Sequence, residues 1–250
     1  MADLSTQRPV RVLSADEIEQ MLASHQLYLK TEYHEGHRAD FSSADLTGLD
    51  FVGLDLRGIK MDRAVLREAT FIGANLRGAN LIGATAQEGR FDRADLSRAR
   101  LSGANLVSAS IMEACLAQAE IEFAVMANAV LQGACLCEAD MSGTVLDGGV
   151  LTRADLRKAN LRGTGLRDAR LDRADLRGAR LGSAVLAGAS LRGADLRGAY
   201  LRLVKLDGAD LSDANLDGVE GLTPAQLNRA HCNNGTKLSA GLTRVEDAKR

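Results

Sequence analysis

A period of five residues runs through most of this chain. Every fifth residue from Phe41 to Leu216 is Phe, Leu, Met or Ile, with Ala86 as the single exception among 36 positions. A second set of positions, two residues before each of these, is nearly always Ala. The register never slips, and a period of five fits neither an α-helix (3.6 residues) nor a β-strand (2.0 residues). The chain is therefore predicted to turn through one side of a square every five residues.

The residues between the two apolar sets are turn formers. In residues 73–78 (GANLRG), the small residue and the Leu are expected to point inward, while Asn and Gly tolerate unusual backbone angles. Four such sides make a coil of about 20 residues, and about nine coils stacked at ~4.8 Å give a rod ~43 Å long. Residues twenty apart should lie above one another, so Phe51, Phe71 and Phe91 are expected to stack inside the rod.

The composition agrees with a narrow interior. Aromatic residues make up 3% of the chain and Trp is absent, whereas 46% of the residues are hydrophobic, mostly Leu and Ala. A net charge of −2 gives no overall signal for nucleic acid or a membrane, and no apolar run approaches the ~18 residues of a membrane span. Four Cys residues without a secretory signal predict free thiols in a reducing compartment, and we expect a cytoplasmic protein.

The repeat resembles the motif A(D/N)LXX of the pentapeptide repeat family. Residues 154–158 (ADLRK), 159–163 (ANLRG) and 194–198 (ADLRG) follow this motif in full, and the resemblance covers residues 39–218. It implies an all-β solenoid, the right-handed quadrilateral β-helix, and a bacterial source. It implies little about function, because one fold hosts many functions.

Residues 1–38 are predicted to cap the first coil, which would otherwise expose unpaired strand edges. The segment Ser14–Glu17 reads as a capping box, and apolar residues follow it at helical spacing. We therefore expect a helix near residues 15–30.

Residues 219–250 are predicted to cover the last coil. Thr223 followed by Pro224 is typical of a helix start, so we expect a short helix that reaches about Ala230. From Asn233 onward the residues are polar, and we expect a flexible tail.

Catalysis is not expected. A solenoid filled with Leu and Ala leaves no room for a pocket, and residues 39–218 contain no His, the usual general acid or base. His34 and His37 could form a metal pair, but no further ligand lies nearby in the sequence, so a structural or solvent role is favoured. We predict that the protein is not an enzyme and has no cofactor.

A thiol cluster is the remaining candidate for metal or redox chemistry. Cys115 and Cys135 are twenty residues apart, which predicts a Cα–Cα distance of ~5 Å, within the range of a disulfide. Cys137 should lie on the same side of the rod. Metal-binding cysteines usually come with a fourth ligand, so unmodified thiols are favoured and no metal site is predicted.

The surface charge is banded along the rod. Residues 101–152 contain six acidic residues and no Lys or Arg, whereas residues 153–205 contain 13 basic and five acidic residues. Within the basic second half, three Asp/Arg pairs recur every twenty residues, at Asp155/Arg157, Asp175/Arg177 and Asp195/Arg197, and we expect them to neutralise one another. The candidate basic patch consists of Arg153, Arg157, Arg162, Arg173, Arg177, Arg180 and Arg197.

The acidic middle also carries apolar residues at outward positions. By the twenty-residue rule they fall on two adjacent faces of the fourth to sixth coils. A contiguous apolar patch flanked by charge is typical of a protein interface, although β-branched residues also simply favour extended chain. The candidate interface residues are Val107, Met112, Val125, Val130, Val145 and Val150.

These features favour a non-catalytic interaction scaffold, a rigid rod that binds an unidentified protein partner or a second copy of itself. One alternative follows from the resemblance, because its best-understood branch protects DNA gyrase by mimicking DNA. A mimic needs negative potential along its whole length, which the basic second half opposes. A further alternative is that the basic second half binds nucleic acid or an anionic surface, but it lacks aromatic side chains interleaved for base stacking, so nucleic acid is not the expected partner.

Overall fold

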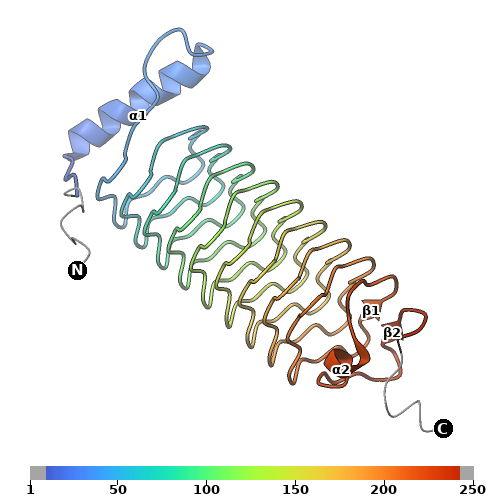
Figure 1. Cartoon of the computed structure of the whole chain (residues 1–250). Helices are drawn as coiled ribbons and strands as arrows, with labels where there is room; N and C mark the ends of the chain where they lie inside the picture. Colours follow the sequence, from blue (N-terminus) through green and yellow to red (C-terminus); the bar gives the residue numbers. More distant parts are fainter. Residues whose placement is uncertain (1–9, 243–250) are drawn as a thin grey trace, which may run out of the picture.

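The computed structural model describes residues 10–242, and they form a long rod with the two described ends at opposite extremities (Figure 1). Single parallel bridges link residues twenty apart, from Asp40–Lys60 to Tyr200–Glu220. The period of five residues thus builds a β-solenoid, as the sequence predicts. Each coil pairs with the coil before and the coil after it, which satisfies the backbone without long strands.

The repeating backbone unit is the same on every side of the coil. The N–H of Phe41 donates to the carbonyl of Lys60 at 2.8 Å, and the N–H of Lys60 donates to the carbonyl of Ala39 at 3.2 Å. A turn follows, closed by the N–H of Ala44 and the carbonyl of Phe41 at 3.0 Å. The third residue of this turn has a positive φ, as in a type II turn. That requirement explains the frequent Gly at this position, although many sides carry a polar or charged residue there instead.

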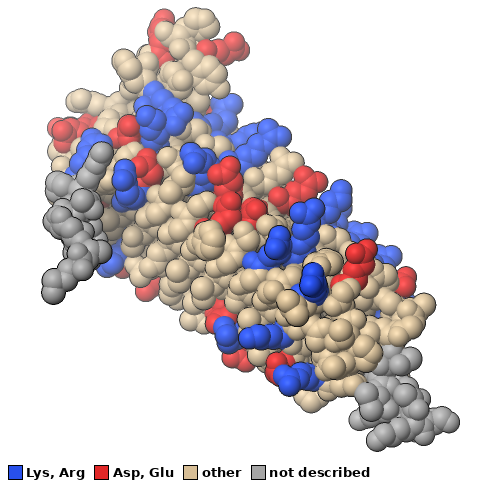
Figure 2. Space-filling view, in the orientation of Figure 1, with Lys and Arg blue, Asp and Glu red and all other residues tan. Residues whose placement is uncertain are grey.

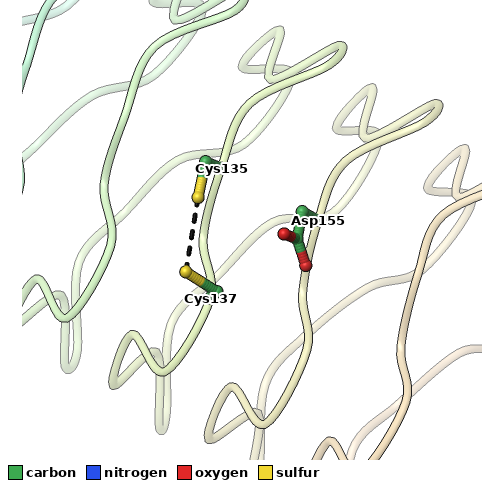
Figure 3. A group of neighbouring side chains, drawn as sticks. All are labelled: Cys135, Cys137 and Asp155. Atoms are coloured by element: carbon green, nitrogen blue, oxygen red, sulfur yellow. Dashed lines mark hydrogen bonds between the residues drawn. The ribbon is translucent and has the colours of Figure 1, made fainter.

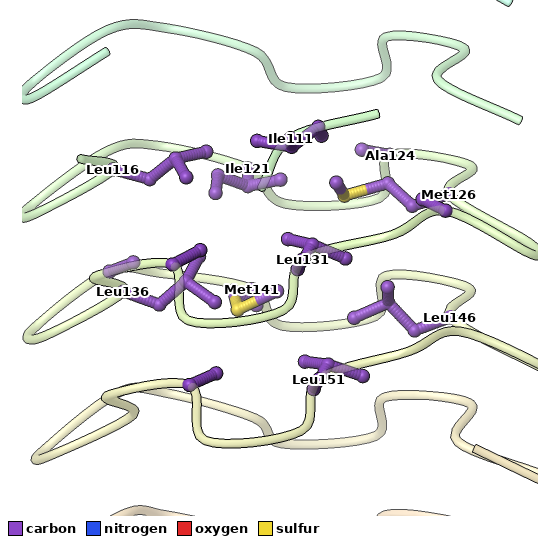
Figure 4. Packing of buried hydrophobic residues seen from close by; sticks show 14 of the residues in the cluster. Ile111, Leu116, Ile121, Ala124, Met126, Leu131, Leu136, Met141, Leu146 and Leu151 are labelled. Carbon is purple, nitrogen blue, oxygen red and sulfur yellow. The ribbon is translucent and has the colours of Figure 1, made fainter. Parts of the chain in front are cut away.

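The two apolar sets fill the interior. Inward Leu, Ile, Met and Phe side chains that are twenty residues apart in the sequence stack into columns. Ile111, Leu131 and Leu151 form one such column in Figure 4. Phe51, Phe71 and Phe91 stack as predicted, with ring centroids 4.8 and 4.9 Å apart.

Departures from Ala in the second set have local reasons. Thr144 and Thr164 are buried, and their hydroxyls donate to the carbonyls of Ile121 (2.8 Å) and Met141 (2.9 Å). Gly89 lies beside Phe91, where an added Cβ would stand 2.9 Å from the ring.

Helix α1 (Ala15–Lys30) lies across the N-terminal end of the rod (Figure 1). Its capping box is formed, since Ser14 Oγ accepts from the N–H of Glu17 at 3.2 Å and Glu17 Oε2 accepts from the N–H of Ser14 at 2.7 Å. Gln26 Nε2 donates to the carbonyl of Asp55 at 2.7 Å, which attaches the helix to the solenoid.

The C-terminal segment follows the last bridges of the rod. Helix α2 (Pro224–Leu227) has Thr223 as its N-cap and ends at Leu227, which is buried, three residues before the predicted end at Ala230. Strand β1 (Asn215–Leu216) pairs in parallel with strand β2 (Lys237–Leu238). Residues 233–242, for which a flexible tail is expected, thus include a segment paired with the solenoid, while residues 243–250 lie outside the described part of the chain.

Candidate functional site

Four of the six predicted interface residues lie in two outward columns. Val125 pairs with Val145 and Val130 with Val150, each across one coil step. Val125, Val145 and Met112 are 39%, 39% and 38% exposed, whereas Val107, Val130 and Val150 are half-buried. The exposed part of the candidate interface is therefore smaller than the predicted set of six.

Phe123, which is not among the six predicted interface residues, is the most exposed apolar side chain of residues 101–152. It occupies the positive-φ turn position, with φ 57°, and is 73% exposed. Its ring lies over Gly143, where an added Cβ would stand 2.7 Å from two ring carbons. The twenty-residue spacing between an outward Phe and a Gly was a signal that could have identified this contact. We call Phe123, Val125 and Val145 the mid-rod apolar corner.

The acidic residues of the middle are largely satisfied by neighbouring coils. Glu113 pairs with Arg93 at 2.9 Å, Glu120 with Arg100 at 3.2 Å, and Asp147 with Arg167 at 3.3 Å. Glu122, next to Phe123, accepts from the Ser102 hydroxyl at 2.7 Å. On the face in Figure 2, basic and acidic side chains are interspersed along the rod.

Three arginines of the candidate basic patch belong to the Asp/Arg ladder. Arg157, Arg177 and Arg197 each donate to the Asp two residues earlier, with shortest distances of 2.6 Å. Arg157 also lies 3.8 Å from Asp175, and Arg177 lies 3.8 Å from Asp195. Hydrogen bonds from Arg157 hold the pKa of Asp155 below its usual value, and Asp155 in turn raises the pKa of Arg157. The positive charge of each of these arginines is therefore neutralised by the Asp residues of the ladder.

The other four arginines lie in two shallow grooves. Arg153 and Arg173 line a groove that also contains Asp168 and Asp172, while Arg162 and Arg180 line a second groove beside Tyr200. The seven residues thus occupy three separate places on the rod. Within residues 10–242, the side chains of these four arginines form no ion pair or hydrogen bond.

The thiol cluster forms on the column that carries the Asp/Arg ladder (Figure 3). Cys135 Sγ lies 3.3 Å from Cys137 Sγ, and the Asp155 carboxylate lies within 4.8 Å of both sulfurs. Cys115 is the bridge partner of Cys135 on the preceding coil. Burial and the hydrogen bond with Cys135 raise the pKa of Cys137 to about 11, and burial also raises the pKa of Cys115. All of these cysteines are free thiols.

Asp155 is the member of this cluster that was not predicted. It lies twenty residues after Cys135, so the twenty-residue rule places it next to the thiols. The motif places Asp155 in the Asp/Arg ladder alone, whereas in the structure it belongs to both the ladder and the thiol cluster.

His34 and His37 are exposed and do not come together with other ligands in the described residues. His34 Nδ1 lies 2.8 Å from the carbonyl of Thr31, and the N–H of His37 donates to Ser24 Oγ at 2.9 Å. His25 is buried instead, and burial lowers its pKa. No helix within residues 10–242 has the length and apolar character that a membrane crossing requires.

The architecture defines a repeat protein of the β-solenoid class, in which a five-residue unit sets every side of the coil. A sequence profile described as pentapeptide repeats matches residues 37–220 with eight copies. The chain belongs to the pentapeptide repeat family, and its fold is the right-handed β-helix that the resemblance implies.

Solved structures of the same family resemble the chain. HetL, a pentapeptide repeat protein involved in heterocyst differentiation regulation from the cyanobacterium Nostoc sp. strain PCC 7120, is 29% identical, with a TM-score of 0.50, over 92% of this chain and 98% of its own. Full-length QnrB1, a plasmid-mediated fluoroquinolone resistance protein, is 20% identical, with a TM-score of 0.39, over 76% of this chain and 94% of its own. A comparison with curated proteins gives no match.

Proposed function

We propose that this protein is a non-catalytic interaction scaffold of the bacterial cytoplasm, a rod of nine coils closed by α1 and by the C-terminal segment. Its mid-rod apolar corner binds another protein. The observation that carries the proposal is Phe123, a large apolar side chain that is 73% exposed on a turn where most sides of the coil have Gly or a polar residue. Exposed aromatic side chains are the residues that most often anchor protein interfaces.

The charge around the corner indicates the chemistry of the partner. Residues 101–152 contain no Lys or Arg, and Glu122 directly precedes Phe123. A partner with an apolar pocket and a basic rim would bury Phe123 and complement Glu122, whose carboxylate accepts from the Ser102 hydroxyl and forms no ion pair within residues 10–242. We therefore infer a protein partner with a basic rim around an apolar pocket.

Phe123→Ser tests this proposal, with Leu203→Ser as a matched control. Leu203 occupies the same column and the same turn position, with φ 59° and 66% exposure, but lies outside the mid-rod apolar corner. We expect Phe123→Ser to weaken the affinity of a purified partner by about 30-fold or more, as for a central interface anchor. The affinity of Leu203→Ser should stay within about twofold of that of wild type. Added salt should weaken the binding of the partner to wild type.

Candidate partners would come from a comparative pull-down with the full chain, followed by titration with the purified protein. Capture of the same proteins by wild type, Phe123→Ser and Leu203→Ser would contradict the proposal. Sedimentation of wild type, Phe123→Ser and Leu203→Ser measures their oligomeric state and so tests for self-association. If wild type and the control are dimers and Phe123→Ser is a monomer, the occupant of the corner is a second copy of this chain and not another protein.

The DNA-mimic alternative is less well supported by the charge pattern. Residues 153–205 carry 13 basic and five acidic residues, which opposes sustained negative potential along the rod. A gyrase supercoiling assay tests the DNA-mimic alternative. Inhibition or protection of gyrase by the purified rod at micromolar concentration would favour this function. Direct nucleic-acid binding by the second half is opposed by the Asp/Arg ladder, which occupies three of its arginines.

A further inference from the structure

Two kinds of metal ligand, cysteine thiols and a carboxylate, meet on one corner of the rod, and neither has a part in the proposed interface. Cys135 and Cys137 come from one coil, Asp155 comes from the next coil, and Cys115 comes from the coil before. The backbone places these residues, because the outward position of each coil lies directly beside the same position twenty residues away. Their side chains are half-buried, so they are partly desolvated and still accessible to an ion.

The separations suit a small four-coordinate cation. Tetrahedral Zn²⁺ with Zn–S bonds of ~2.3 Å and a Zn–O bond of ~2.0 Å requires S···S separations of ~3.8 Å and S···O separations of ~3.5 Å. The observed S···S distance between Cys135 and Cys137 is 3.3 Å, and the Asp155 oxygen lies within 4.8 Å of both sulfurs. Small side-chain rotations therefore bring the three atoms to the required spacing.

We propose that Cys135, Cys137 and Asp155 bind a thiophilic divalent cation, with Zn²⁺ as the best fit, and that Cys115 rotates in as the fourth ligand. Sulfur ligands favour Zn²⁺ over Mg²⁺ or Ca²⁺, which prefer oxygen. Each bound cysteine exchanges its S–H bond for a metal–sulfur bond and releases one proton to solvent. Asp155 binds as the carboxylate, and the cation does not change its oxidation state.

Arg157 is compatible with this site as a supporting residue. It donates to both Asp155 oxygens, with Nε–Oδ1 at 2.8 Å and Nη2–Oδ2 at 2.6 Å. A carboxylate accepts about four hydrogen bonds or metal bonds, so one oxygen can bind the cation while Arg157 keeps the carboxylate oriented. The positive charge of Arg157 also offsets the negative charge that the thiolates bring.

The test is titration of the reduced, metal-free full-length protein with Zn²⁺ by calorimetry and with Cd²⁺ by ultraviolet absorption. Cd²⁺ bound to thiolates shows sulfur-to-metal charge transfer, which an ion held by carboxylates alone does not. We expect one equivalent per chain. Cys137→Ser should weaken binding by about 100-fold, and Asp155→Asn and Cys115→Ser by about 10-fold or more.

Two matched variants control for general effects. Cys232→Ser removes the one cysteine outside the cluster, and Asp195→Asn removes a carboxylate of the same ladder that has no thiol beside it. Both should bind as wild type, and circular dichroism should show that every variant keeps the fold.

Absence of the charge-transfer absorption in wild type would overturn the site, as would equal losses in Cys137→Ser and Cys232→Ser. If Asp155→Asn binds the ion with wild-type affinity, Asp155 is not a ligand of the site. If Cys115→Ser binds with wild-type affinity, Cys115 is not the fourth ligand. Phe123 is not a ligand, so failure of this test leaves the proposed protein interface unaffected.

Discussion

Cys135/Cys137 and Asp155/Arg157 occupy equivalent positions on consecutive coils, yet their chemistry is opposite. The first pair places two cysteine sulfurs 3.3 Å apart, and the second places a carboxylate 2.6 Å from a guanidinium. Both pairs flank a buried Leu, Leu136 in the first case and Leu156 in the second. Packing thus requires Leu at the inward position of both coils. The outward positions on the same backbone carry two thiols in one coil and an ion pair in the next.

The largest expected effect comes from the buried Leu that lies between the two residues of each pair. We call the Cys135/Cys137 pair the thiol corner and the Asp155/Arg157 pair the ladder corner. Leu136→Ala and Leu156→Ala each leave a cavity in a closely packed column, and each should lower the free energy of unfolding by about 2–5 kcal/mol. Both side chains are fully buried, so the two losses should be similar. Urea denaturation followed by circular dichroism measures them. A clearly smaller loss at one corner would show that the interiors are not equivalent.

The second effect distinguishes the two corners. Zn²⁺ at 100 times its dissociation constant should raise the free energy of unfolding of wild type by about 2.7 kcal/mol, because the ion binds the folded chain. The double variant Cys135→Asp/Cys137→Arg extends the Asp/Arg ladder into this corner, should keep the fold and should gain nothing from Zn²⁺. Chemical denaturation with and without the ion checks both expectations. An equal gain in the variant would mean that the ion acts elsewhere.

A smaller effect tests whether the backbone of the two corners is the same. Glu138 and Lys158 follow the two pairs and have positive φ, 59° and 58°. Gly relieves the strain of this conformation but is more flexible in the unfolded chain, so Glu138→Gly and Lys158→Gly should each stabilise the protein by about 0.5–1 kcal/mol. Thermal unfolding measures both. A destabilising result at Glu138 alone would indicate that its hydrogen bond from Gln118, 2.9 Å long, outweighs the strain.

The fold could be predicted from the sequence because every coil repeats the same steric rule. The inward set from Phe41 to Leu216 alone fixes the sides of the coil, and residues twenty apart then fall into columns, as Phe51, Phe71 and Phe91 do. The helix near residues 15–30 was also predictable, since a capping box is a local signal. The pairing of β2 with β1 was not, because a strand of only two residues, one Lys and one Leu, has no periodic pattern.

The candidate sites were only partly predictable, because side-chain contacts between coils do not follow from the repeat. The twenty-residue rule pairs the backbones of Cys115 and Cys135, but the 3.3 Å contact between sulfurs is the one between Cys135 and Cys137, which depends on their rotamers. Phe123 was missed because Gly is expected at its turn position, and its ring packs over Gly143, where a Cβ would collide with it. The basic residues were grouped by sequence, whereas the rod separates them around its faces.

The smallest expected effect lies in the Asp/Arg ladder, away from the thiols. Hydrogen bonds from Arg197 hold the pKa of Asp195 below its usual value. A carboxyl whose pKa is lower in the folded chain stabilises the fold above the unfolded pKa of about 3.9 and loses that contribution as the pH falls through the folded value. Because the pair is partly exposed and screened by water, Asp195→Asn should lower the free energy of unfolding by about 0.5 kcal/mol at pH 7.

The difference between wild type and Asp195→Asn should shrink as the pH falls below about 4, and added salt should reduce it at neutral pH. Urea midpoints of the two chains from pH 2 to pH 7 measure it. If the two chains do not differ at any pH, Asp195 stabilises the turn through the hydrogen bond from the N–H of Arg197, 3.2 Å long, which Asn can also accept, and not through its charge. In that case the ladder would be a set of turn caps, and the two corners would differ less in electrostatics than their side chains suggest.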